Sequence, residues 1–228
     1  MRGTLVVIVV LLAAAAGWFF SSWDRASLRY RLTYEVNVDG ETRTGSGVIQ
    51  IVSEDTSKLP LFGRGFGFSA TGEAVVVDLG DGRYLFSLLN GAGTLPFPPF
   101  YERYDFDLTR ITAVDVTRVL AREKPSIELT ADQLPMLVTF RNTDDPTSVR
   151  EVDPDNLVAT FGPGVRLESV TLEIADESLT EGKVEKTLSW LCDYKERRVR
   201  LSGQKGPISD NRLSNNLGTG AFKIGDCG

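Results

Sequence analysis

Seventeen consecutive residues near the start of this chain carry no charge, and they constrain how everything after them is placed. The stretch runs from Thr4 to Phe20 and reads TLVVIVVLLAAAAGWFF. As a helix rising about 1.5 Å per residue it spans roughly 25 Å, just short of a hydrocarbon core of about 30 Å. The sequence therefore predicts an N-terminal hydrophobic helix that enters a membrane and delivers the rest of the chain to one side.

Two fates of this segment stay open. In the first it is retained as a signal-anchor, because Trp18, Phe19, Phe20 and Trp23 are residues that favour the headgroup zone. In the second it is a signal peptide, with an A-x-A cleavage site within residues 13–15. Both fates send the remainder of the chain out of the cytoplasm.

Arg2 is the only charged residue before the apolar run. By the positive-inside rule it predicts a cytoplasmic N-terminus and a domain on the opposite side of the membrane, which in a bacterium means an anchor in the inner membrane and a domain in the periplasm. The alternative is a secreted or periplasmic protein after signal cleavage.

Alternating apolar and polar residues predict the first hairpin. The residues from Leu28 to Val38 alternate strictly, Asp39-Gly40 tolerates the positive φ of a tight turn, and residues 41–52 run back. Gly45 and Gly47 interrupt the returning strand, and we expect a β-bulge there.

Further strands follow from the same pattern. Residues 73–79 and 83–89 predict a second hairpin, in which the continuous apolar run 74–77 indicates a central strand covered on both faces. Residues 136–141 and 148–152 predict a third hairpin, and residues 165–174 a single strand.

Helices are predicted at fewer places. Residues 107–122 fit one apolar helical face, and Asp153 with Pro154 predicts the start of a short helix that Gly162 ends. The three prolines of residues 91–100 exclude a helix there. Residues 183–191 suit either a helix or a strand, and the chain beyond residue 202 has the composition of a surface loop.

Sequential strands joined by tight turns, with one or two short helices between them, predict an α+β class that is mainly antiparallel β. We divide the chain into an anchor or signal peptide at 1–23, a strand-rich extracytoplasmic domain at 24–191 and a loop-like tail at 192–228.

Four residues form the candidate contact site. Residues 53–72 are rich in Ser, Pro and Gly, which predicts a mobile loop that carries Phe62, Arg64, Phe66 and Phe68. The aromatic rings either contact a protein partner or the membrane interface, or fold back over the edge of the core.

The two cysteines, Cys192 and Cys227, lie late in the chain. In an oxidising compartment they are expected to form a disulfide that tethers the C-terminal tail. Free thiols are the alternative.

The composition argues against several chemistries. The chain has no histidine, which removes the Ser-His-Asp and Cys-His mechanisms and the usual zinc sites. Its net charge of −6 argues against nucleic acid as a partner. Asp144, Asp145, Asp153 and Asp155 lack the spacing of a calcium loop and suit turns and caps. We expect no catalytic residue, no cofactor and no metal, and lean away from an enzyme.

Three segments carry a resemblance: RYRLTYEVNVDGETRTGSGVIQI, GEAVVVDLGDGRYLFSLL and DPTSVREVDPDNLVATFGPGVRLESVTLEI. They resemble stretches of small uncharacterised bacterial proteins that are secreted or membrane-anchored, and they cover much of residues 29 to 174. The resemblance implies a bacterial envelope protein and transfers no catalytic residue.

Three functions are compatible with these features. The first is a non-catalytic envelope domain that binds a protein partner or scaffolds an assembly. Its N-terminal segment attaches it to the membrane. The second is a carboxylate-dependent hydrolase of cell-wall glycan, which needs two acidic groups about 5 to 10 Å apart in a cleft. The third is a binder of small apolar or lipid ligands in a strand-built cavity.

Overall fold

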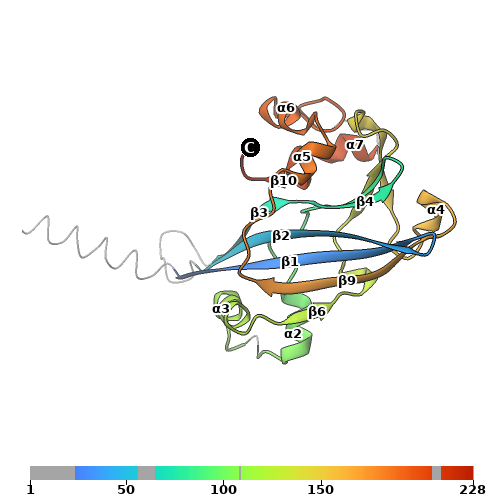
Figure 1. The fold of residues 1–228 in the computed structure, drawn as a ribbon. Helices are drawn as coiled ribbons and strands as arrows, with labels where there is room; N and C mark the ends of the chain where they lie inside the picture. Colours follow the sequence, from blue (N-terminus) through green and yellow to red (C-terminus); the bar gives the residue numbers. More distant parts are fainter. Residues whose placement is uncertain (1–23, 56–64, 108, 207–211, 228) are drawn as a thin grey trace, which may run out of the picture.

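The structure is a computed structural model that describes residues 24–55, 65–107, 109–206 and 212–227. Within these residues the chain folds into two antiparallel sheets with short helices around them (Figure 1). The predicted class, α+β and mainly antiparallel β, is confirmed for this part of the chain. The predicted N-terminal hydrophobic helix lies outside the described residues.

The larger sheet has the strand order β10-β3-β2-β1-β9-β6, and the smaller has the order β4-β5-β7-β8. The strands of the larger sheet, in that order, are Lys223–Ile224, Phe66–Glu73, Glu41–Asp55, Asp24–Val38, Val165–Ala175 and Ser126–Glu128. Those of the smaller sheet are Val75–Gly80, Arg83–Ser87, Leu137–Phe140 and Val149–Val152. The α-helices are α2 Phe97–Tyr104, α3 Ala113–Glu123, α4 Val158–Phe161, α5 Lys183–Thr187, α6 Leu191–Glu196 and α7 Leu213–Asn216. The 3-10 helices are η1 Ala131–Gln133, η2 Pro146–Ser148 and η3 Thr219–Ala221.

The hairpin of β1 and β2 is the longest feature of the fold, and the alternation that predicted it is confirmed. Pairing runs without interruption from Asp24 opposite Asp55 to Val38 opposite Glu41. Asp39 takes the positive φ of 53° that its place in the turn requires. At about 3.3 Å per residue, each 15-residue strand spans roughly 50 Å, so the hairpin has two widely separated ends.

The bulge predicted at Gly45 and Gly47 is wrong, because the register of the two strands does not shift there. The glycines instead let β4 cross β2 closely. A Cβ atom on Gly45 would lie 2.3 Å from the carbonyl oxygen of Val76, far inside van der Waals contact. This crossing joins the two sheets.

The second and third predicted hairpins are confirmed as β4 with β5 and β7 with β8. The prediction that residues 74–77 form a central strand is wrong, because β4 is an edge strand of the smaller sheet. Its side chains are nevertheless covered on both faces. Val75 and Val77 contribute to one hydrophobic core, while Ala74 and Val76 contribute to the other.

The first core lies between the larger sheet, β4 and helices α2 and α3, and Tyr30, Tyr34 and Phe100 are fully buried in it. The second core lies between the smaller sheet and the C-terminal segment. Phe222 is fully buried there and forms ring contacts with Phe86 and Phe140. The expectation of a surface loop beyond residue 202 is therefore wrong for residues 213–224, which form α7, η3 and β10.

Helix boundaries differ from the predictions for local reasons. The prediction that residues 91–100 exclude a helix is wrong, because α2 begins at Phe97. Prolines are tolerated in the first turn of a helix, where backbone N–H groups have no helical partner. The helix α3 begins at Ala113, six residues later than expected, because Thr112 and Asp115 form a reciprocal capping box.

Two further segments, predicted as a short helix and as either a helix or a strand, contain the helices α4 and α5. The helix α4 ends at Gly162 as predicted but does not begin at Asp153, whose carboxylate instead accepts from the backbone N–H of Asp155 at 3.0 Å. The ambiguous residues 183–191 begin with helix α5.

Candidate functional site

Two exposed phenylalanines mark one end of the larger sheet. Phe66 and Phe68 belong to strand β3, which pairs with β2, so the expectation of a mobile loop is wrong for residues 66–72. The side chain of Phe66 is 58% exposed and that of Phe68 is 39% exposed. The other two residues of the predicted contact site, Phe62 and Arg64, lie outside the described residues.

This end of the sheet is also where the described chain begins. Asp24 in β1 lies opposite Asp55 in β2, which in turn lies opposite Phe66 in β3. We call this the proximal end and define it by these three residues together with Phe68. Directly paired residues present their side chains on one face, so the two phenylalanines share the face that α3 covers further along the sheet.

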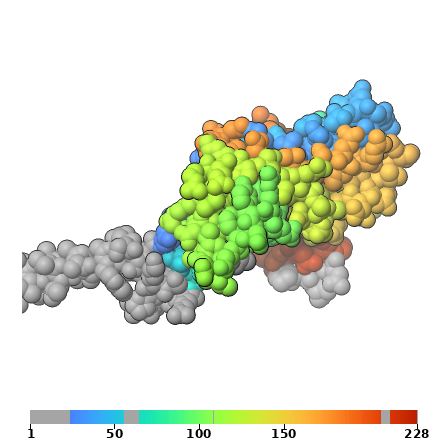
Figure 2. Space-filling view, turned by 90° about the horizontal axis from the view of Figure 1, so that it is seen from below, coloured from blue at the N-terminus to red at the C-terminus, as the bar shows by residue number. Residues whose placement is uncertain are grey.

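The ring of Phe68 is held in place from the α2 side. Its centroid lies 5.3 Å from that of Phe97, and the Phe97 ring lies 5.8 Å from that of Tyr101. Burial raises the pKa of the Tyr101 hydroxyl. Figure 2 shows this side of the molecule, where α2 and α3, in green and yellow-green, form the surface and the start of β1, in blue, lies at its edge. Helix α2 therefore fixes the position of the Phe68 ring through Phe97 and Tyr101.

The charges at the proximal end are paired. The Arg118 guanidinium donates to the Asp24 carboxylate, which holds the pKa of Asp24 below its usual value. Arg25 lies 3.3 Å from Glu54 on the other face of the sheet. The charges within each of these two pairs compensate each other, and the exposed rings of Phe66 and Phe68 lie at the same end of the sheet.

The opposite end of the hairpin, which we call the distal end, consists of the turns at Asp39-Gly40 and Asp81-Gly82 and helix α4. Two hydrogen bonds fix these parts to one another: the Asp39 backbone N–H donates to the Gly164 carbonyl at 3.0 Å, and the Arg83 guanidinium donates to the Phe161 carbonyl at 3.2 Å. Val158 is 48% exposed there.

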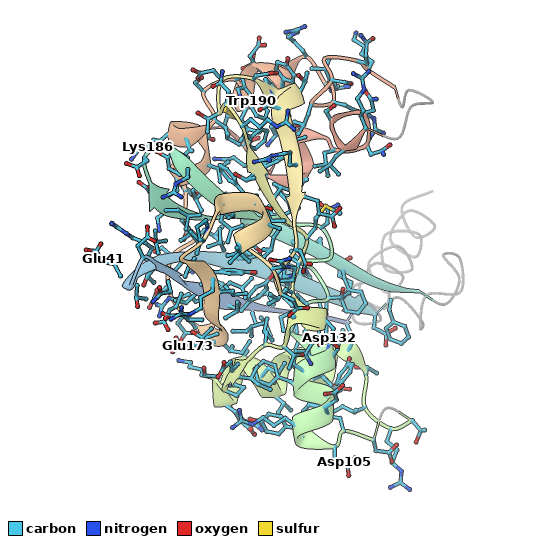
Figure 3. The ribbon with its side chains drawn as sticks, turned by 90° about the vertical axis from the view of Figure 1, so that its right-hand side faces the viewer. Glu41, Asp105, Asp132, Glu173, Lys186 and Trp190 are labelled. Carbon is cyan, nitrogen blue, oxygen red and sulfur yellow. A yellow bond between two sulfur atoms is a disulfide. The ribbon has the colours of Figure 1, made fainter. Side chains whose placement is uncertain are left out.

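Figure 3 looks onto the distal side, with Glu41 beside the first turn and Trp190 in the C-terminal part. Figure 1 shows helix α4, which carries Val158, at the turn end of the β1–β2 hairpin, away from the start of β1.

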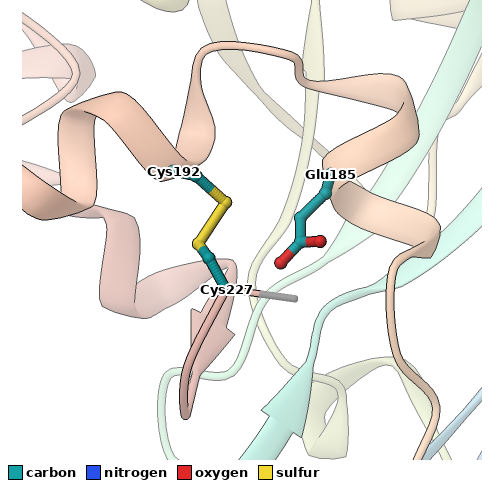
Figure 4. A group of neighbouring side chains, drawn as sticks. All are labelled: Glu185, Cys192 and Cys227. Atoms are coloured by element: carbon teal, nitrogen blue, oxygen red, sulfur yellow. A yellow bond between two sulfur atoms is a disulfide. The ribbon is translucent and has the colours of Figure 1, made fainter.

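A disulfide closes the C-terminal segment. Cys192 and Cys227 are bonded, with their Cα atoms 6.0 Å apart, so the predicted pair is confirmed (Figure 4). Glu185 lies beside the two sulfur atoms, near enough for the three groups to resemble a metal site. Because the sulfurs are bonded to each other they are not thiolates, and this arrangement serves as a staple.

Buried charges surround the staple. Lys223 in β10 lies directly opposite Glu73 in β3, and its ammonium group forms an ion pair with Glu185. Glu73 is 1% exposed and accepts from the Lys183 N–H at 2.9 Å. Burial raises the pKa of Glu73, an effect that the amides at the start of α5 and the charge of Lys223 partly offset.

Sequence reasoning missed this cluster because its members come from strands and helices that are far apart in the chain. No sequence motif marks Glu73 and Lys223 as buried, or the half-buried Glu185 as their neighbour. Their burial also limits their chemistry: a substrate has no access to a carboxyl group that is 1% exposed.

Two of the four acidic residues noted in the sequence, Asp145 and Asp153, accept hydrogen bonds in local turns. Asp145 caps η2 by accepting from the Thr147 N–H at 2.9 Å, and Asp153 closes the turn that precedes α4. These are the turn and cap roles that the spacing indicates.

No helix within the described ranges is both long and apolar enough to cross a membrane. The stretch from Thr4 to Phe20 lies outside those ranges. No protein-family model matches this chain, and neither a curated protein nor a solved structure matches it. The resemblance to bacterial envelope proteins therefore stays a prediction.

Proposed function

We propose that this chain is a non-catalytic domain of the bacterial envelope, tethered to the inner membrane by its N-terminal segment and binding a protein partner on the periplasmic side. The observation that carries the proposal is the wide separation of the two ends of the β1–β2 hairpin. Asp24, the fourth residue after the uncharged stretch, begins a strand of roughly 50 Å, and the turns that form the distal end lie at its far side.

The distal end suits a partner because it is preorganised. Its turns are tied by one backbone hydrogen bond, from Asp39, and one side-chain hydrogen bond, from Arg83, so binding costs little ordering of the chain. Val158 provides an exposed apolar group, and Asp39, Asp81 and Asp155 are exposed in the two turns and in the segment before α4. A partner with an apolar contact residue and basic residues around it fits this surface.

The disulfide supports a compartment outside the cytoplasm. Disulfides persist in oxidising environments such as the periplasm, whereas cytosolic thiols are kept reduced. Secretion after signal cleavage is the alternative location, and it retains the same domain and the same distal end.

The other two functions gain no support from a specific contact. For a glycan hydrolase, the carboxyl group with the raised pKa, Glu73, is buried beneath α5. For a lipid binder, the space between the layers is filled by large side chains, namely Tyr30, Tyr34, Phe86 and Phe100. The partner-binding proposal is therefore preferred.

Location is tested by expressing the full chain in a bacterial host and blocking free thiols before lysis. The proposal predicts full-length mass in the membrane fraction, with Cys192 and Cys227 protected from alkylation until reduction. A product shortened by about 15 residues in the soluble fraction would instead establish secretion after cleavage.

Partner binding is tested in the same cells with a photoreactive side chain at Val158. We expect a discrete protein adduct, which a matched variant with the label at the exposed Thr109, in the segment between α2 and α3, does not give. The substitution Val158→Asp in an otherwise native chain is expected to lower recovery of that partner at least tenfold. Equal adducts at both positions would contradict a distal partner site.

A further inference from the structure

Large apolar side chains that are exposed are few in the described part of the chain: Phe66, Phe68 and Val158. Two of the three, Phe66 and Phe68, lie at the proximal end, at alternate positions of β3 on the same face of the sheet. Val158 lies at the distal end and serves as a natural comparison.

The proximal phenylalanines are close to the point where the N-terminal segment attaches. From Asp24 to Phe66 the path crosses two neighbouring strands, a distance of about 10 Å at the usual strand spacing. Four residue steps separate Phe20 from Asp24, and they span at most about 14 Å when fully extended. A tether embedded through Phe20 therefore keeps Phe66 near the lipid surface.

The chemistry of this end matches the headgroup zone of a bilayer. Aromatic side chains favour that zone, and Trp18, Phe19, Phe20 and Trp23 already give the neighbouring sequence the same character. Attraction to anionic lipid is not needed, because the nearby charges of Asp24 and Arg118 neutralise each other.

We infer that Phe66 and Phe68 dock into the headgroup zone of the membrane that holds the N-terminal segment, so that the domain rests on that membrane with its proximal end. Phe68, fixed against Phe97, sets the orientation, and Phe66 is the more exposed of the two. This inference rests on the proposed tether. It adds that the domain has a fixed orientation, with the distal end directed away from the lipid.

Photocrosslinking of the full chain in zwitterionic phosphatidylcholine nanodiscs tests the inference. A photoreactive phenylalanine analogue is placed separately at Phe66, at Phe68 and at Val158. We expect lipid adducts at Phe66 and Phe68 to exceed those at Val158 at least fivefold. The ratio should stay within twofold when salt is raised or phosphatidylglycerol is added, because insertion here is apolar rather than electrostatic.

Equal lipid adducts at the three positions would overturn the inference, as would a protein adduct in place of lipid at Phe66 in native membranes. These outcomes are distinct from failure of the tether, in which the chain does not enter nanodiscs or the membrane fraction at all.

A second measurement uses the unmodified chain, in case the variants do not fold. In hydroxyl-radical footprinting, Phe66 should oxidise faster than Val158 if both face water, since it is aromatic and more exposed (58% against 48%). Slower oxidation of Phe66 than of Val158 in nanodiscs supports lipid coverage. Faster oxidation contradicts it.

Discussion

Replacing Gly45 with alanine tests how the two sheets are joined. The added Cβ would lie 2.3 Å from the Val76 carbonyl oxygen and 2.9 Å from its carbonyl carbon. Both are backbone atoms of β4, so relief requires a shift of the strand rather than a change of rotamer. Overpacking of this kind costs about 1–3 kcal/mol. Alanine recovers about 0.5–1 kcal/mol through its lower backbone entropy in the unfolded chain, so we expect a net loss of about 1–2 kcal/mol.

Gly47 is the matched control, because it lies on the same strand and the same face. Its added Cβ would meet the Val75 side chain at 3.2 Å, and that methyl group can move. We expect Gly47→Ala to change the free energy of unfolding by less than about 0.5 kcal/mol, since the entropy gain offsets the contact.

The assay is thermal unfolding of the full chain in detergent micelles, followed by far-UV circular dichroism. A loss of 1–2 kcal/mol corresponds to a decrease in Tm of about 2–8 °C for a chain of this size. Equal Tm values for the Gly45 and Gly47 variants would refute the close crossing of β4 over β2.

Three further predictions concern stability. Replacing Cys192 and Cys227 with serine opens a loop of 35 residues, and urea unfolding should show a loss of about 4 kcal/mol by the chain-entropy model; an unchanged midpoint would contradict the staple. Burial raises the folded-state pKa of Glu73, so its contribution is full below the unfolded pKa and is lost as pH rises through the folded value. Glu73→Gln should therefore gain stability relative to the native chain as the pH rises above the usual pKa of a glutamate, and a constant difference would count against a raised pKa. Thr112→Ala removes the cap that accepts from the Asp115 N–H and should cost about 1 kcal/mol, measured as faster hydrogen exchange of the α3 amides; no change would argue against the capping box.

The parts of the fold that were predictable are those whose signal is local. Strict alternation and a turn of the Asp-Gly type identify β1 with β2, and an Asp-Gly turn between two apolar segments identifies β4 with β5. In β9 the break in alternation near Ser169 corresponds to a register shift opposite Glu35, where the pattern and the irregularity agree.

Glycine and proline caused the main errors. Their average effect is to disrupt regular structure, but their effect depends on position. Gly67 stands in β3, where its lack of a side chain costs no buried contact, and Pro98 and Pro99 stand in the first turn of α2. A composition argument across such a segment does not capture this dependence on position.

The C-terminal segment was misjudged because its burial depends on distant residues. Phe222 is buried only because Phe86 and Phe140, from the smaller sheet, surround it. Lys223 is buried because Glu73 and Glu185 supply compensating charge. The cysteine pair could be identified from sequence, and so could Phe66 and Phe68 as residues of interest, whereas the buried charged cluster could not.

The proposed tethered function depends most on which side of the membrane the domain lies. Protease treatment of intact spheroplasts and of inverted inner-membrane vesicles measures this directly, with the fragments identified by mass. We predict digestion of the domain in spheroplasts and protection in inverted vesicles. Protection in spheroplasts together with digestion in inverted vesicles would place the domain in the cytoplasm and contradict a tethered periplasmic function.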